Sequence, residues 1–146
     1  MLLGETKPMQ PNQITAAIID HSIKIHRTLG PGLLESVYHR VLVYELRKGG
    51  FQVETEVPVP VHWDGNKIDV SFRADIIVNR SVLVELKSVE TISKIHKKQT
   101  LTYLKLTNMK LGLLLNFGEA LLKDGVHRIV NGLEESCEYE PRKTPK

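Results

Sequence analysis

Polar and apolar residues alternate along residues 68–78, a pattern that is typical of a β-strand buried on one face. In this strand Asp75 falls on the face opposite the apolar side chains. A second run, residues 82–89, alternates in the same way and places Glu85 and Lys87 together on one face. Charged side chains in such apolar strands require a partner or a function.

The three residues between these runs, 79–81, decide whether the two carboxylates meet. A two-residue turn would separate Asp75 from Glu85, since a slip of one residue moves every side chain to the opposite face. A three-residue turn pairs Val78 with Val82 and sets Asp75 opposite Glu85, with their Cβ atoms about 5 Å apart. We predict the three-residue turn.

Two carboxylates at this distance repel each other unless a cation lies between them. Coordination by oxygen alone suits a hard ion such as Mg²⁺ or Mn²⁺. A metal there, with the Lys87 ammonium beside it, can activate water and stabilise negative charge on a phosphate. Asp75, Glu85 and Lys87 therefore indicate phosphodiester hydrolysis, although these three residues alone fit the solvated edge of a sheet equally well.

Helical spacing of apolar residues predicts two helices before these strands, over residues 13–29 and 33–48, with Asn12 as the N-cap of the first. Glu35 and Glu45 both fall against apolar positions of the second helix. A buried carboxylate is costly without a partner, so each needs a basic residue or a metal. For Glu35 two interpretations stay open: an edge residue paired with a base, or a carboxylate that reaches the metal site.

An edge strand is predicted over residues 51–63, because Pro58 and Pro60 cannot donate hydrogen bonds to a neighbouring strand. It completes a three-stranded antiparallel meander with the two strands described above. The apolar run of residues 109–117 predicts a strand buried on both faces, and residues 126–130 predict a last short strand. A helix between the meander and the buried strand would make a βαβ crossover.

That third helix is predicted from Thr91 or Ile92 to Asn108. Its core side is expected to consist of Ile92, Ile95, Tyr103 and Leu106. Gln99 lies four residues before Tyr103, so both should point inward, where their polar atoms need partners. The opposite side carries four lysines, Lys94, Lys97, Lys98 and Lys105. These lysines fit either a solvated face or contacts with the phosphates of a nucleic acid.

The chain of 146 residues is expected to form one domain over residues 11–133, with flexible termini at 1–10 and 134–146. A net charge of +3 permits nucleic-acid binding without requiring it. The single cysteine, Cys137, excludes a disulfide framework and a cysteine-based zinc site. Neither a signal peptide nor a membrane span is apparent, which favours a cytoplasmic protein without membrane contact.

Several segments in order resemble the GxxExxY protein family, named for Gly32, Glu35 and Tyr38 of this chain: LGPGLLESVY, FRADIIV, VLVELKSVE, IHKKQTLTYLK and LGLLLNFG. The resemblance runs from Ile14 to Asn131. That family is usually placed in the PD-(D/E)XK nuclease superfamily, and its arrangement resembles the RecB/Cas4-like branch. It implies an α/β, restriction-endonuclease-like αβββαβ core, here with an extra N-terminal helix.

The resemblance also implies roles for individual residues. The implied catalytic set is Glu35, Asp75, Glu85, Lys87, Gln99 and Tyr103. The implied ligands of the metal are Asp75, Glu85 and the backbone carbonyl of Leu86, with Glu35 as a further candidate. Arg73 would either neutralise Glu35 or hold a phosphate, and the choice stays open.

Together these observations lead us to expect a small nuclease that depends on Mg²⁺ or Mn²⁺ and acts on DNA. The alternative is a catalytically inactive module of nuclease fold that binds nucleic acid or a protein partner. A third interpretation, a structural domain without a nucleic-acid role, requires the lysines of the third helix to be inert.

Overall fold

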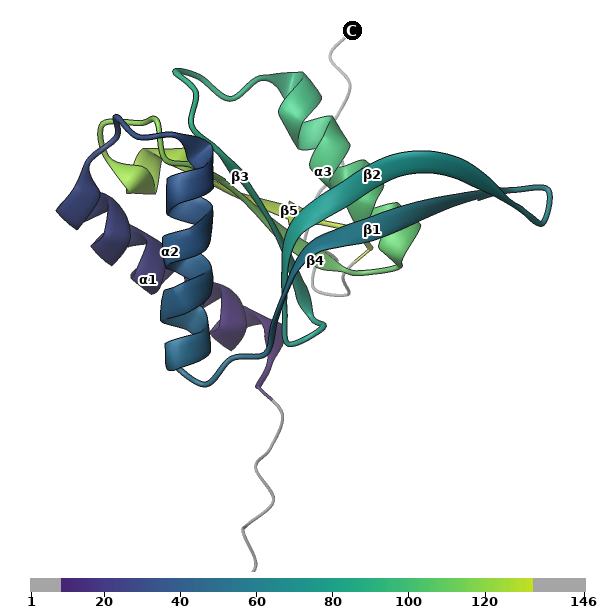
Figure 1. Ribbon diagram of the computed structural model, residues 1–146, viewed down its shortest axis with the longest axis horizontal. Helices are drawn as coiled ribbons and strands as arrows, with labels where there is room; N and C mark the ends of the chain where they lie inside the picture. Colours follow the sequence, from purple (N-terminus) through teal and green to yellow (C-terminus); the bar gives the residue numbers. More distant parts are fainter. Residues whose placement is uncertain (1–8, 133–146) are drawn as a thin grey trace, which may run out of the picture.

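The structure is a computed structural model that describes residues 9–132, apart from the side chains of residues 70 and 71 (Figure 1). The flexible termini expected at 1–10 and 134–146 lie almost entirely outside the described residues, and so does Cys137. Across residues 9–132, no helix combines the length and the apolar character that a membrane span requires.

The described chain folds into one five-stranded sheet with helices around it. In chain order the elements are α1 (Pro11–Leu29), α2 (Glu35–Lys48), β1 (Val53–Trp63), β2 (Asn66–Val78), β3 (Val82–Lys87), α3 (Lys94–Thr107), β4 (Leu111–Asn116), the 3₁₀ helix η1 (Leu122–Gly125) and β5 (Val126–Val130). The strands lie in the order β1-β2-β3-β4-β5, and only β3 and β4 run parallel among these neighbours. The predicted αβββαβ order, with one helix in front and a last short strand, is confirmed.

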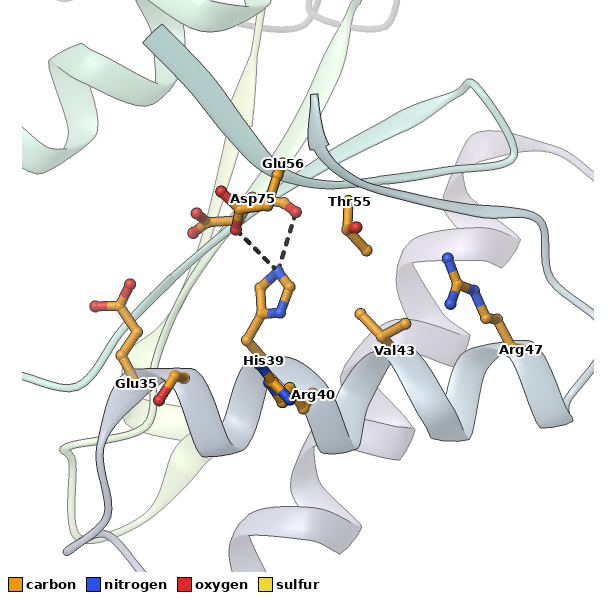
Figure 2. A pocket seen from close by; sticks show the side chains of 9 residues that line it. Glu35, His39, Arg40, Val43, Arg47, Thr55, Glu56 and Asp75 are labelled. Atoms are coloured by element: carbon orange, nitrogen blue, oxygen red, sulfur yellow. Dashed lines mark hydrogen bonds and ion pairs between the residues drawn. The ribbon is translucent and has the colours of Figure 1, made fainter. Parts of the chain in front are cut away.

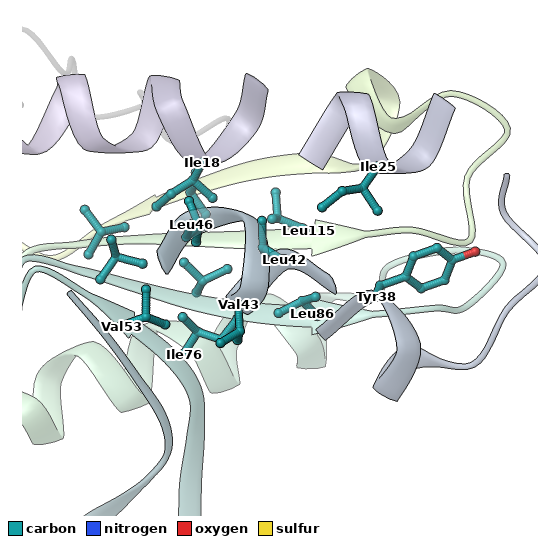
Figure 3. Close-up of a cluster of buried hydrophobic side chains, with 14 of the residues drawn as sticks. Ile18, Ile25, Tyr38, Leu42, Val43, Leu46, Val53, Ile76, Leu86 and Leu115 are labelled. Atoms are coloured by element: carbon teal, nitrogen blue, oxygen red, sulfur yellow. The ribbon is translucent and has the colours of Figure 1, made fainter. Parts of the chain in front are cut away.

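The sheet separates two hydrophobic clusters. Helices α1 and α2 cover one face, and α3 covers the other (Figure 1). In β3, Val82, Val84 and Leu86 belong to the α1/α2 cluster, whereas Leu83 packs with the α3 cluster. This confirms the predicted alternation of β3. Figure 3 shows the larger cluster, in which α1 and α2 side chains meet the sheet.

Strand β4 is buried along its whole length, as its apolar sequence predicts. It lies between β3 and β5, so both of its edges are paired and both of its faces are covered. At the other end of the sheet, β1 is the edge strand that Pro58 and Pro60 indicate, and its pairing with β2 shifts register between Val59 and Val61. The β1–β2 hairpin extends beyond the rest of the sheet (Figure 1).

The start of α1 differs from the prediction. Its N-cap is Gln10 rather than Asn12, because Pro11 is well suited to the first helical position and the helix therefore begins there. The Gln13 side chain accepts a hydrogen bond from the Gln10 backbone N–H at 2.9 Å. The Asn12 amide oxygen instead accepts a hydrogen bond from the Arg128 guanidinium at 2.6 Å, which ties α1 to β5.

The inner face of α3 is the predicted one only in part: Tyr103 and Leu106 pack in the α3 cluster as predicted, whereas Ile95 and Gln99 do not. The buried residues of this helix are Thr100, Tyr103 and Leu104. Ile95, expected in the core, is 73% exposed, and Gln99 is exposed as well. The prediction for these two residues is wrong because only the C-terminal half of α3 packs on the sheet through its apolar side chains. The capping residue Ser93 begins the helix instead of Thr91 or Ile92.

We predict a large difference between two glycine substitutions. A Cβ atom at Gly118 would clash with the backbone oxygen, carbon and nitrogen of Val89, whereas a Cβ at Gly32 would meet nothing within 4 Å. Gly118→Ala should therefore lower the free energy of unfolding by about 1–3 kcal/mol or more. Gly32→Ala should stay within about 0.5 kcal/mol of the wild type. Urea unfolding measures both, and equal midpoints for the two variants would contradict this packing.

Candidate active site

The predicted site lies where β2 and β3 separate. The turn over residues 79–81 has the predicted length, since Val78 pairs with Val82, Ile77 with Leu83, and Ile76 with Val84. The backbone ladder ends there, one position short of Asp75 and Glu85. The predicted register is therefore confirmed, with Asp75 and Glu85 at the position directly after the last ladder pair.

The two carboxylates bridge the gap between the strands through backbone groups. The backbone N–H of Asp75 donates to Glu85 Oε2 at 2.9 Å. The backbone N–H of Leu86 donates to Asp75 Oδ2 at 2.9 Å. Each acid thus accepts a hydrogen bond from the other strand, so both are held beside each other with one oxygen engaged.

A distortion of β1 and β2 explains the separation. Glu56 has a positive φ of 49° and drops out of the register between the pairs on either side of it. Across from it, the alternation of β2 inverts at Asp75: Ala74 belongs to the α3 cluster, but Ile76 belongs to the α1/α2 cluster. The regular alternation predicted for this strand therefore fails at the one residue that matters most for the site.

Helix α2 brings a carboxylate and a histidine to the same place. Glu35 is the first residue of α2, and His39 lies one turn later. His39 Nε2 donates to the backbone oxygen of Asp75 at 3.1 Å and lies 3.7 Å from the Glu56 carboxylate (Figure 2). We did not predict His39. The spacing of four residues from Glu35, which puts both on one side of a helix, is the signal that could have found it.

The loop before α2 is fixed by Tyr38, which is fully buried and stacks on Phe117 with ring centroids 4.5 Å apart. Its hydroxyl donates to the carbonyl of Gly30 and accepts a hydrogen bond from the N–H of Leu33 at 3.0 Å. Ser88, just after β3, donates to the carbonyl of Leu33 at 2.9 Å. Tyr38 and Ser88 together therefore hold the start of α2 near the end of β3.

Lys87 ends β3, and its backbone is tied to β4. The carbonyl of Lys87 accepts a hydrogen bond from Phe117 N–H at 2.8 Å. The Asn116 side-chain oxygen accepts hydrogen bonds from the N–H groups of Val89 and Gly118, both at 3.0 Å. Asn116 is fully buried and was not predicted. It holds the chain that leaves β3 directly after Lys87.

Burial and mutual repulsion shift the acids of the site in one direction. Burial, followed by the charge of Asp75, raises the pKa of Glu85 to about 8. Burial also raises the pKa of Asp75, against the opposing effect of the Leu86 N–H. Partial burial and the charge of Asp75 raise the pKa of Glu35 at the rim. The nearby Lys87 ammonium lowers all three pKa values, so it lies within electrostatic reach of each carboxylate.

Of the remaining predicted residues, Tyr103 lies at the site, whereas Gln99 and Arg73 do not contact its carboxylates within residues 9–132. Tyr103 reaches the site from α3: it is only 7% exposed, and burial together with the charges of Glu85 and Asp75 raises its pKa. Gln99 stays exposed one turn earlier on the helix. Arg73 donates to the backbone carbonyl of Glu56 at 3.5 Å, and no ion pair joins it to Glu35 within residues 9–132.

A cleft of about 710 Å³ opens beside these residues, between α2 and the distorted strands. We call it the α2–β1 cleft. Its lining consists of Glu35, Ser36, His39, Arg40, Val43 and Arg47 from α2, Thr55 and Glu56 from β1, and Asp75 from β2. Figure 2 shows these side chains along α2, facing β1 and β2.

The donor set fits a hard divalent cation. Within residues 9–132, Asp75 Oδ1 and Glu85 Oε1 accept no hydrogen bond, which leaves one anionic oxygen on each acid free. The same residues contain no group of three or more His, Cys, Asp or Glu side chains arranged to hold a metal. Mg²⁺ is usually bound through one or two carboxylates with water in the other positions, so two free oxygens suffice.

Comparison with known proteins agrees with this architecture. The family described as "PD-(D/E)XK nuclease superfamily" matches residues 12–129. A solved structure described as "Crystal structure of SSO0001" is 24% identical, with a TM-score of 0.49, and the match covers 87% of this chain and 65% of that one. The chain thus spans slightly less than two thirds of that protein. No curated protein matches this sequence.

We predict that the metal-free protein becomes less stable as the pH rises from about 4.5 to about 8. An ordinary glutamate loses its proton near 4.5, but folded Glu85 keeps it up to a pKa of about 8. The folded state therefore binds more protons than the unfolded state in this window, and the free energy of unfolding falls with rising pH. In Glu85→Gln the urea midpoint should vary less with pH and should exceed that of the wild type at pH 8.

The control for this measurement is Asp20→Asn, which removes an exposed carboxylate on α1. It should reproduce the pH dependence of the wild type. If the wild type and Glu85→Gln showed the same slope of midpoint against pH, burial of the Glu85 carboxyl would not be the cause.

Proposed function

Because the chain belongs to the PD-(D/E)XK nuclease superfamily, we propose that it is a metal-dependent nuclease that hydrolyses phosphodiester bonds in DNA. The observation that carries this proposal is the reciprocal pair of hydrogen bonds that holds Asp75 and Glu85 side by side. A buried carboxylate beside a half-buried one is unfavourable unless protons or a cation neutralise them. A nuclease site uses the cation.

The metal, Mg²⁺ or Mn²⁺, would be held by the free oxygens of Asp75 and Glu85 and by the backbone carbonyl of Leu86. Glu35, across the cleft on α2, would complete the set through water. When bound, such a cation supplies positive charge to the phosphate and acidifies a coordinated water. His39, which holds the backbone of Asp75, would keep that carboxylate in place.

The protein's own residues supply the other parts of the reaction. Hydrolysis forms a bond between a water oxygen and phosphorus, breaks the bond to the leaving oxygen, and delivers a proton to that oxygen. The Lys87 ammonium, whose charge lowers the pKa of all three carboxyls, would orient the water and stabilise charge on a non-bridging oxygen. Tyr103 would hold a phosphate oxygen through its hydroxyl, and the exposed Gln99 would contact the same strand.

One observation favours the alternative, a nuclease-fold module without catalytic activity. Asp75 and Glu85 already stabilise the separated strands by accepting backbone hydrogen bonds. A protein that had lost activity would still need both acids for its fold. Lys87 favours the nuclease over the inactive module. Its ammonium makes no direct ion pair within residues 9–132, so no structural role explains why a lysine stands there.

We predict that the protein cleaves labelled DNA in the presence of Mg²⁺ or Mn²⁺. Asp75→Asn and Lys87→Ala should each reduce the rate by about 100-fold or more, since each removes charge that acts on the transition state. Asp20→Asn on α1 should cleave at the rate of the wild type. Equal rates in all four proteins, measured on single- and double-stranded substrates, would refute the nuclease function.

We also predict that Mg²⁺ stabilises the folded protein and that Asp75 and Glu85 mediate the effect. At about a hundredfold excess over the dissociation constant, binding to the folded state alone adds about 2.7 kcal/mol to the free energy of unfolding. Thermal unfolding near pH 8 measures this, with NaCl at matched ionic strength as the control. The increase should disappear in Asp75→Asn, and an increase of equal size in that variant would place the metal elsewhere.

A further inference from the structure

The α2–β1 cleft continues beyond the acidic residues along α2, past Arg40, and ends at Arg47. We infer that it binds a single strand of DNA on one side of the bond that is cut, and that Arg40 and Arg47 contact its phosphates. This inference rests on the proposed function and specifies its substrate: a strand that is unpaired next to the cleavage position.

The charges along the cleft change sign from one end to the other. Glu35, Glu56 and Asp75 lie at the end near the start of α2, and Arg40 and Arg47 follow along the helix (Figure 2). A cation at the acidic end would leave the cleft attractive to phosphate along its whole length. A short anionic chain that starts at the metal and runs towards Arg47 matches this order of charges.

Both arginines have N–H donors that make no hydrogen bond within residues 9–132. Arg40 is exposed and makes no ion pair or hydrogen bond within residues 9–132. Arg47 donates from one terminal nitrogen to the carbonyl of Val53 at 2.9 Å, which orients its guanidinium at the end of the cleft. A guanidinium carries five N–H donors in a planar fork, so most of those on Arg47 stay available for a phosphate.

The spacing of the arginines fits a nucleotide repeat. Seven residues of α-helix separate Arg40 from Arg47, which corresponds to a rise of about 10 Å. Successive phosphates of a stacked strand advance by about 3.4 Å along the axis. Because the phosphates also wind around that axis, successive phosphates lie about twice this rise apart, so the two arginines match phosphates about one to two nucleotides apart. Glu35 lies a further 7 to 8 Å along α2, which leaves room for about one nucleotide before the metal.

The size of the cleft favours one strand over two. Its volume of about 710 Å³ lies in the range that encloses a drug-sized ligand, which is enough for a few nucleotides but not for paired strands. Val43 and Thr55 line it between the arginines, from α2 and from β1 respectively. These side chains offer small apolar surfaces to sugars and bases without a pattern that reads sequence.

The test is binding of fluorescent oligothymidylates to the intact protein in Ca²⁺, a hard cation that the same oxygen ligands accept. Lengths from about two to eight nucleotides and a blunt hairpin duplex would be compared by anisotropy. The variants are Arg40→Gln, which removes the charge, and Arg40→Lys, which keeps it. The control is Arg128→Gln, since Arg128 lies on β5 at the opposite edge of the sheet from β1.

We expect Arg40→Gln to weaken binding of the longest strand about five- to tenfold, as loss of one charge-assisted contact implies. The slope of log affinity against log salt should decrease by about 0.7. Arg40→Lys should recover most of the affinity, and Arg128→Gln should bind like the wild type. Affinity should rise with strand length up to about three or four nucleotides and then level off.

Two results would overturn the inference: binding by Arg40→Gln within twofold of the wild type, or equal and equally Arg40-dependent binding of the blunt duplex. A ribose strand of the same length, if bound tighter than the deoxyribose strand, would overturn the choice of DNA. Cleavage is measured separately on the same proteins. Cleavage that needs Asp75 but not Arg40 refutes only this inference, whereas Arg40-dependent binding without any cleavage refutes only the proposed function.

Discussion

The hydrogen bonds exchanged between Asp75 and Glu85 are the constraint on which the site depends. Where β2 leaves β3, the N–H groups of Asp75 and Leu86 lose their place in the ladder, and an unpaired buried N–H costs about 1–3 kcal/mol. The carboxylates satisfy both groups. The same contacts hold the buried Glu85 carboxyl beside the half-buried Asp75 carboxyl. The groups that satisfy the backbone therefore repel each other when both are charged, and the proposed cation would offset that repulsion.

Two buried residues, Tyr38 and Asn116, fix the chain segments around Asp75 and Glu85. Tyr38 fixes the loop before α2, and Ser88 ties that loop to the end of β3, so together they set the place of Glu35 and His39. Asn116 does the corresponding work on the other side, where it holds the chain just after Lys87. Both residues are fully buried and neither belongs to the proposed catalytic set, so preorganisation here depends on residues that chemistry alone would not single out.

Sequence patterns predicted those features that local periodicity determines. The alternation of β3 placed Glu85 and Lys87 on one face, and the length of the turn after Val78 determined the strand register. The inversion of β2 at Asp75 was beyond such patterns, because it follows from the positive φ of Glu56 on a different strand. The inward orientation predicted for Gln99 was wrong for a related reason. The spacing of apolar residues gives the apolar side of α3, but only packing decides which half of the helix contacts the sheet.

Protons and cations compete for the same oxygens in this site. With Glu85 titrating at about 8, the metal-free site holds a proton at neutral pH, and a cation must displace it. In the proposed site, metal binding would therefore strengthen as the pH rises, while the two carboxylates without a cation become more unfavourable. Displacement of the proton would also change the charge of the cleft. One proton leaves its acidic end negative, so this end repels phosphate, whereas a divalent cation would remove that repulsion. In the proposed function, a cation would therefore serve the approach of the substrate as well as hydrolysis, and both roles would originate in the pair of acids Asp75 and Glu85.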